Sequence, residues 1–320
     1  MARIWTILKR LKLRFRDYLV YFQRSTKLQL QSQMRDDIRG LRRQIANLEW
    51  LIARPTQNPV TARGWKVFSQ SDEDGIVLEI MKRINLTEGI FVEIGIGDGL
   101  ENNTLVLLAQ NWRGAWFDTK KLAFDIGVFG GRLSFAQGFI TAENVVVEID
   151  KALATLQTEA IDFLSVDVDG NDFYLLTRIL ESGFRPAVMV IEINPLFPPP
   201  LRYVQPYSAN FQWDGLSGDS GVSLQTVAET LQSFSYFCVG CNEFTGVNAF
   251  FVSENFRSQF LDVPSSLSEL YVGPKFGSTR SNSSRTEISP NLISQIARLQ
   301  VQGGVWRGPA TRSSASDSSS

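Results

Sequence analysis

The sequence of 320 residues contains no histidine. Histidine is the side chain that most often serves as a general base near neutral pH. If this protein carries out proton chemistry, carboxylates must perform much of it. The absence of histidine also removes the usual nitrogen ligand of a zinc site.

Cysteine is scarce too, since Cys238 and Cys241 are the only two. A zinc site built on this CxxC pair would need about two further nitrogen or sulfur ligands. A redox motif of the same spacing opens a helix, whereas SYFCVGCNEF is patterned as strand and turn. We predict two reduced, structural cysteines. Together with the lack of a cleavable signal, they predict a cytoplasmic protein.

Long apolar runs are missing, and no segment approaches the ~18 residues of a membrane-spanning helix. Positive charge is concentrated in residues 1–54, which hold 13 Lys and Arg against 4 Asp and Glu. Within 3–22, apolar residues recur at helical spacing among basic ones. This pattern predicts an amphipathic helix that lies either on the inner face of a membrane or on a protein surface.

The steps between apolar residues in 34–52 are four and three in alternation, as in a short coiled coil. We expect this segment to mediate self-association or to bind a partner protein. No nucleic-acid partner is expected. Residues 1–54 thus form a helical and coiled-coil arm in front of the main domain.

A globular α/β domain is expected over residues 64–255. Continuous apolar segments alternate with segments of helical period, which is typical of a parallel sheet covered by helices on both faces. The last two apolar segments predict an antiparallel hairpin. The stretch 119–143 looks irregular, 256–307 is a C-terminal extension, and 308–320 is a disordered Ser-rich tail. Buried strands are expected in GIFVEIGIG, GAWFD, IDFLSVDVD and PAVMVIEIN.

The most informative stretch is FVEIGIGDGLENNT, in which Gly95, Gly97 and Gly99 follow a predicted strand. Glycines at a strand-to-helix turn allow positive φ and a close approach of a ligand to the backbone. The GxGxG spacing differs from the GxGxxG of dinucleotide sites. Acids surround the loop, among them Glu93 and Asp98, and they favour a cationic, amine-bearing ligand over a pyrophosphate.

The next apolar segment, GAWFD, ends at Asp118. An acid at the end of the second strand is in position to accept hydrogen bonds from both ribose hydroxyls. With the glycine loop, it predicts a site for a positively charged nucleoside such as S-adenosylmethionine. The alternative is a tight turn beside unrelated acids.

The segments SQSDEDGI, FVEIGIGDG, ENNT, NWRGAWFD and DFLSVDVDGNDF, in this order, resemble the FkbM-type methyltransferases. The resemblance covers roughly residues 65–255 and extends to a subgroup from sugar and polysaccharide loci. It implies a class I methyltransferase (Rossmann-like) fold, doubly wound and mostly parallel, with S-adenosylmethionine as cofactor. Many relatives have Glu-Pro-Asn-Pro where this chain has Asp118 followed by Thr-Lys-Lys. The cofactor contacts expected are Glu93, Gly95, Gly97, Asp98, Asn103, Asp118 and Asn144, with Glu143 on the adenine side.

A second group of acids follows the next two apolar segments. Ligands in open α/β sheets bind beyond the carboxyl ends of the strands, so we expect Asp167, Glu192 and Asn194 to form an oxygen-rich site suited to Mg²⁺. Asp167 and Asp169 are the catalytic candidates, with Asp169 as the base that removes a proton from an acceptor hydroxyl. Alternatively, these acids only support the following helix, which we expect of Asp172.

The segment NPLFPPPLRYVQPYSANFQWDG is rich in proline and aromatic residues. Tyr203, Tyr207 and Trp213 are candidates for stacking on a sugar ring or another acceptor. The alternative is a surface loop that packs on its own aromatic side chains.

The leading hypothesis is an S-adenosylmethionine-dependent O-methyltransferase for a sugar, glycan or glycolipid intermediate, with carboxylate activation of the acceptor, with or without a metal. One alternative is a nucleotide-sugar glycosyltransferase in which Asp167-Val168-Asp169 is a metal-binding DxD motif. Another is a non-catalytic scaffold that is recruited through residues 1–54.

Overall fold

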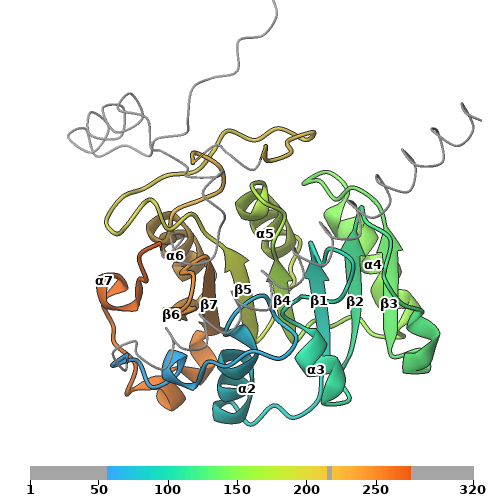
Figure 1. The fold of residues 1–320 in the computed structure, drawn as a ribbon, viewed down its shortest axis with the longest axis horizontal. Helices are drawn as coiled ribbons and strands as arrows, with labels where there is room; N and C mark the ends of the chain where they lie inside the picture. Colours follow the sequence, from blue (N-terminus) through green and yellow to red (C-terminus); the bar gives the residue numbers. More distant parts are fainter. Residues whose placement is uncertain (1–55, 215–217, 275–320) are drawn as a thin grey trace, which may run out of the picture. The chain divides into compact units, whose positions relative to one another are not determined.

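The computed structural model describes residues 56–214 and 218–274 (Figure 1). The amphipathic helix predicted in 3–22, the coiled coil in 34–52 and the tail 308–320 lie outside these residues. In the described part of the chain, every helix is too short or too polar to cross a membrane.

A seven-stranded sheet in the order β3-β2-β1-β4-β5-β7-β6 forms the centre of the fold (Figure 1). The first five strands are parallel, whereas β7 runs antiparallel to both β5 and β6. The sheet is therefore mostly parallel with a C-terminal antiparallel hairpin, as predicted. The strands are β1 (Ile90–Ile94), β2 (Arg113–Asp118), β3 (Leu133–Gln137), β4 (Phe163–Val166), β5 (Val188–Glu192), β6 (Tyr236–Cys241) and β7 (Asn248–Ser253).

Helices cover both faces of the sheet, which confirms the doubly wound arrangement. Apolar side chains of α4, α5 and α6 pack on one face, and those of α2 and α3 pack on the other. In β4, Phe163 faces the second cluster and Leu164 the first, so this strand is buried on both sides. The helices are α2 (Glu73–Arg83), α3 (Leu105–Ala109), α4 (Val145–Thr155), α5 (Asp172–Glu181), α6 (Leu224–Ser233) and α7 (Leu267–Leu270).

One strand differs from the sequence-based expectation. Residues 119–143 looked irregular, yet they contain β3, which pairs with β2 at the edge of the sheet. Leu133 is the only buried residue of β3, so the strand lacks the continuous apolar pattern of its neighbours. The core also extends past the expected limits of 64 and 255, because Val60 and Phe260 are buried in it.

Buried polar residues join the start of α2 to the connection between β6 and β7. The Asp72 carboxylate accepts the backbone N–H of Glu243, and Glu73 accepts the side-chain amides of Asn242 and Asn248. Burial and the neighbouring Glu73 raise the pKa of Asp72 to about 6. The SQSDEDGI segment therefore has a structural role here, since it fixes α2 to the hairpin.

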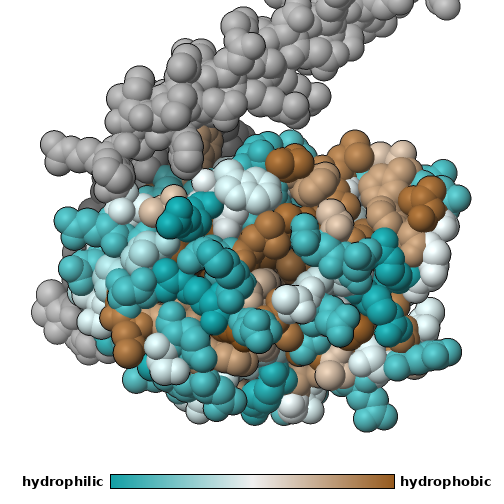
Figure 2. Space-filling model, turned by 90° about the horizontal axis from the view of Figure 1, so that it is seen from below, coloured by the Kyte–Doolittle hydropathy of each residue, from teal (hydrophilic) through white to brown (hydrophobic). Residues whose placement is uncertain are grey.

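The parallel strands point their carboxyl ends toward the top of Figure 1. Figure 2 views the opposite end, where hydrophilic residues cover most of the face and apolar residues lie between them. The predicted site residues follow the carboxyl ends of the strands, so the site is built at the other end of the sheet.

Candidate functional site

The predicted site residues gather at the carboxyl edge of four neighbouring parallel strands. Glu93 lies in β1, and Asp118 is the last residue of β2. Asp167 follows β4 directly, and Glu192 ends β5. The sheet order places these ends side by side, at the edge where open α/β sheets bind ligands.

Gly95 and Gly97, in the loop after β1, differ in their surroundings. Gly95 has φ +94°, and a Cβ there would lie 1.6 Å from the carbonyl oxygen of Asp167. Only glycine lets this loop pass the chain that follows β4. Gly97 also has a positive φ of +62°, but a Cβ there would meet nothing within 4 Å. Gly97 therefore borders open space, where a ligand can approach the backbone.

Asp118 connects this loop to the end of β2. Its Oδ2 accepts the backbone N–H of Gly97 at 2.7 Å, and its Oδ1 accepts that of Lys120 at 2.7 Å. A carboxylate offers about four acceptor positions. The half-buried Asp118 therefore retains acceptor capacity beside the open space at Gly97. This donor and acceptor set fits the ribose of a nucleoside.

Glu93 does not face that space, contrary to the expected cofactor contact. It is 1% exposed and accepts the backbone N–H of Asn103 at 2.8 Å and of Thr104 at 3.0 Å. It also accepts the hydroxyls of Thr104 at 2.5 Å and Ser165 at 3.2 Å. Burial raises the pKa of Glu93 to about 7. Glu93 thus ties the approach to α3 to the centre of the sheet.

Asn103 belongs to the same buried network. Its side-chain amide donates to the Ser165 hydroxyl at 3.1 Å, and the residue is 4% exposed. Ser165 was not predicted as part of the site. The signal was present, because Ser165 is the one polar residue inside the apolar strand FLSV.

The remaining cofactor candidates lie on two loops. Asp98 is exposed, and its carboxylate accepts the backbone N–H of Leu100. Asn144 accepts the N–H of Thr141 and donates to the carbonyl of Phe139, so its side chain shapes the loop after β3. The Asn144 side chain, which we expected to contact the cofactor, thus bonds within its own loop.

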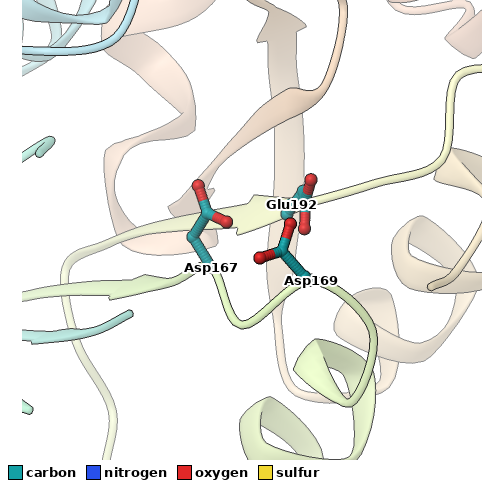
Figure 3. Close-up of side chains that lie close together, drawn as sticks. All are labelled: Asp167, Asp169 and Glu192. Atoms are coloured by element: carbon teal, nitrogen blue, oxygen red, sulfur yellow. The ribbon is translucent and has the colours of Figure 1, made fainter. Parts of the chain in front are cut away.

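Three carboxylates converge after β4 and β5. Asp167, Asp169 and Glu192 each place an oxygen within 4.8 Å of the others, and their carboxylates lie together in Figure 3. Asp169 is exposed and has φ +58°, a left-handed conformation that is uncommon for a residue with a side chain. The turn that it makes brings its carboxylate toward Glu192.

The electrostatics of this cluster favour a bound proton or cation. Burial raises the pKa values of Asp167 and Glu192 well above their ordinary ranges, and repulsion by Asp172 and Asp169 adds to the effect. Within the described residues, no lysine or arginine forms an ion pair with Asp167 or Glu192. An all-oxygen set of this charge is the kind that Mg²⁺ prefers.

Asp172 has a structural role, as predicted, although its partners are not those of a simple helix cap. It opens α5 and accepts the backbone N–H groups of Val168 and Gly170, each at 2.7 Å. Burial raises the pKa of Asp172 to about 7. The side chain thus holds the loop that carries Asp169 in place.

Asn194 has other partners than a metal ion. Its amide donates to the carbonyl oxygens of Gly218 and Ser220 at 2.9 and 2.8 Å, and its Oδ1 accepts the N–H of Leu196. The side chain is therefore used to shape the loop after β5. Asp169, and not Asn194, is the third residue beside Asp167 and Glu192 in the acidic cluster.

The three aromatic candidates differ in accessibility. Tyr203 is 1% exposed and stacks on Phe197 with ring centroids 4.0 Å apart, and its hydroxyl donates to the carbonyl of Asp219. This burial corrects the expectation that Tyr203 contacts an acceptor. Tyr207 and Trp213 are half-buried on the same segment. Tyr207 packs on Tyr174, with ring centroids 5.0 Å apart.

Both cysteines are buried and unpaired in β6, in agreement with the predicted reduced, structural role. Burial raises the pKa of Cys238 to about 12 and that of Cys241 well above its ordinary value. Thiols of this kind stay protonated and unreactive at neutral pH.

Solved structures that resemble this chain include a putative hemolysin from Lactococcus lactis, with a TM-score of 0.34 and 13% identity over 58% of this chain and 89% of that one. An O-methyltransferase family protein from Burkholderia thailandensis has a TM-score of 0.32 and 10% identity over 56% and 57% of the two chains. An O-methyltransferase family 2 protein from Planctomyces limnophilus DSM 3776, in complex with apigenin, has a TM-score of 0.30 and 14% identity over 52% and 50%.

The chain thus spans 57% and 50% of the two O-methyltransferase structures. No protein-family model matches the chain, and no curated protein matches it.

Proposed function

We propose that this protein is an S-adenosylmethionine-dependent O-methyltransferase of FkbM type that acts on a sugar, glycan or glycolipid intermediate. The observation that carries the proposal is the open space at Gly97 beside the Asp118 carboxylate. The acidic cluster of Asp167, Asp169 and Glu192 lies at the same edge of the sheet and supplies groups for acceptor chemistry.

The cofactor supplies a methyl group that needs positioning and no further activation. Gly97 lets the nucleoside approach the backbone, and Asp118 accepts hydrogen bonds from the ribose hydroxyls. The acids around the loop, including the exposed Asp98, favour the positive charges of the sulfonium and the amine. Glu93 acts indirectly, because it holds Asn103 and Thr104, which follow the loop, against the sheet.

The acceptor hydroxyl needs help, since an alcohol is a poor nucleophile while it keeps its proton. In the absence of histidine, a carboxylate must take up that proton as the methyl group is transferred. Asp169 is the exposed member of the cluster and is the base in this proposal. In the metal-assisted alternative, Asp169 would join Asp167 and Glu192 in holding a divalent cation, which would lower the pKa of the acceptor hydroxyl.

The acceptor class is proposed from the chemistry of the cluster and from the resemblance to proteins of sugar loci. Neighbouring hydroxyls of a sugar match an oxygen-rich cation site. The half-buried rings of Tyr207 and Trp213 lie on the segment that follows β5 and are the candidates for contact with a sugar face.

We also propose that residues 3–22 contact the cytoplasmic surface of a membrane and that residues 34–52 mediate self-association or bind a partner. Deletion of residues 1–54 tests both roles. The truncated protein should retain cofactor affinity while it loses vesicle binding or its oligomeric state. Loss of cofactor affinity on deletion would show that the arm is part of the catalytic unit.

A thermal-shift comparison of two ligands separates this proposal from the glycosyltransferase alternative. S-adenosylhomocysteine should raise the melting temperature, whereas a uridine diphosphate sugar with Mn²⁺ should not. Stabilisation by the nucleotide sugar and Mn²⁺ alone would instead support Asp167-Val168-Asp169 as a DxD motif.

A further inference from the structure

The hydroxyl of Tyr207 satisfies a donor and an acceptor on the loop after β3. It accepts the backbone N–H of Ala142 at 3.2 Å and donates to the Glu143 carboxylate at 2.6 Å. Tyr207 belongs to the segment after β5, which is 64 residues away from Glu143 in the sequence. One side chain thus joins two loops at the carboxyl edge of the sheet.

This contact lies next to the strand end that carries Asp118. Asp118 pairs with Gln137 in the register of β2 and β3, and its carbonyl accepts the N–H of Gly138 at 2.9 Å. The loop from 138 to 144 therefore starts directly beside Asp118. A nucleoside whose ribose is held by Asp118 brings its base within reach of this loop.

Adenine has the hydrogen-bonding pattern that Ala142 and Glu143 would match. Its exocyclic amino group donates, and the ring nitrogen beside it accepts. The Ala142 N–H donates and the Glu143 carboxylate accepts, so the pair is complementary to adenine. The Tyr207 hydroxyl performs both functions with a single oxygen, so Tyr207 and a base would compete for the same two partners.

We propose that Tyr207 is an internal substitute for adenine, so that cofactor binding displaces Tyr207 from Ala142 and Glu143. This inference rests on the proposed function, because it requires an adenine-containing ligand. The pair Ala142 and Glu143 recognises the base, and Tyr207 keeps the pair occupied in the free protein. Cofactor affinity is then reduced by the fraction of molecules in which Tyr207 is bound.

The segment around Tyr207 also contacts residues at the start of α5. The Tyr174 hydroxyl donates to the carbonyl of Gln205 at 2.6 Å, and the Asn171 amide donates to that of Ser208 at 2.8 Å. We call residues 203–211 the strap. Its contacts extend from Ala142 and Glu143 to the start of α5.

The end of the strap lies against Gly170, between Asp169 and Asn171. A Cβ at Gly170 would lie 2.4 Å from the ring of Phe211, so this contact requires glycine. Release of Tyr207 removes one of the anchors of a segment that rests on the acid loop.

Titration calorimetry with S-adenosylhomocysteine tests the competition. Tyr207→Phe removes the hydroxyl and should raise the affinity about three- to tenfold over wild type. Tyr236→Phe is the matched control, since the Tyr236 hydroxyl donates to the carbonyl of Pro186, before β5 at the other end of the sheet, and should leave the affinity unchanged. Equal or weaker binding by Tyr207→Phe would overturn the inference.

The Tyr207→Phe background isolates the role of Glu143, because the contact between the two residues is already absent there. Adding Glu143→Ala should lower the affinity about tenfold, whereas adding Asp150→Ala, an exposed acid on α4, should not change it. An unchanged affinity with Glu143→Ala would show that Glu143 only anchors the strap, which contradicts base recognition.

The inosine analogue of the ligand gives a second test, because its 6-oxo group accepts where the amino group of adenine donates. Tyr207→Phe should not improve binding of this analogue.

Limited proteolysis tests displacement directly. In wild type, S-adenosylhomocysteine should speed chymotrypsin cleavage after Tyr207 several-fold, and unchanged cleavage would contradict displacement. If neither wild type nor Tyr207→Phe binds S-adenosylhomocysteine, the proposed function itself fails; if wild type binds and Tyr207→Phe binds no more tightly, only the displacement fails.

Discussion

The backbone N–H of Gly97 donates to the Asp118 carboxylate at 2.7 Å and thereby joins the glycine loop of β1 to the end of β2. Asp118 is also the residue expected to bind the ribose. One carboxylate thus fixes the shape of the loop and keeps acceptor positions for a ligand.

Alanine substitutions at Gly95 and Gly97 should have different effects. Gly95→Ala places a Cβ 1.6 Å from a backbone oxygen at a φ of +94° and should cost about 4 kcal/mol of unfolding free energy or more. Gly97→Ala meets no atom within 4 Å and should cost only the ~1–2 kcal/mol of a left-handed residue. Urea unfolding measures both.

Gly97→Ala, the milder change for stability, should have the larger effect on ligand affinity. The Cβ of Gly97→Ala projects into the space assigned to the nucleoside, so this variant should fold and bind S-adenosylhomocysteine weakly. Wild-type affinity in Gly97→Ala would place the nucleoside elsewhere. A Gly95→Ala protein as stable as wild type would contradict the packing of the loop on the chain after β4.

The stability of the fold should decrease as the pH rises from about 4.5 to 7. Burial raises the pKa of Glu93 from 4.5 to about 7, so the folded protein holds this proton more tightly than the unfolded chain. The stabilisation is complete below the unfolded pKa and is lost as the pH passes the folded pKa. The shift corresponds to roughly 3 kcal/mol at most. The raised pKa of Asp72, about 6, acts in the same direction.

Urea unfolding of wild type and Glu93→Gln at several pH values measures the contribution of Glu93. The glutamine does not titrate, so wild type should lose stability relative to the variant between pH 5 and pH 7. The raised pKa would be contradicted if the difference in unfolding free energy between the two proteins stayed constant over this range. A change in favour of wild type would contradict it as well.

A divalent cation should bind at the acidic cluster of Asp167, Asp169 and Glu192. Mn²⁺ followed by electron paramagnetic resonance should show one site per chain. Glu192→Gln and Asp169→Asn should each weaken binding about tenfold or more, because each removes a charged ligand. The control Asp150→Asn should bind like wild type. Unaltered binding in Glu192→Gln would place the cation at other residues.

The fold was predictable wherever the pattern of apolar residues is strong. The buried strands β1, β4 and β5 are continuous apolar runs, and the glycine loop identifies the strand-to-helix turn between β1 and α3. In contrast, β3 is an edge strand with one buried residue, so its local sequence does not distinguish it from a loop. Its pairing with β2 depends on residues distant in the sequence.

The site was predictable in position more than in detail. Asp118, Asp167 and Glu192 follow from the rule that ligands bind at the carboxyl ends of parallel strands. Burial of Glu93 and Tyr203 did not follow, because it depends on partners from other elements, such as Ser165 for Glu93. The contact between Tyr207 and Glu143 likewise depends on how two distant loops meet.

The most direct test of the account is titration calorimetry of the full chain with S-adenosylhomocysteine, comparing wild type, Asp118→Ala and the exposed-acid control Asp150→Ala. Wild type and control should bind one ligand with equal affinity. Asp118→Ala should bind about 10- to 100-fold more weakly, since it loses hydrogen bonds to a charged group. Absence of binding by wild type at millimolar ligand, or equal binding by Asp118→Ala, would contradict the proposed cofactor site and favour a non-catalytic scaffold.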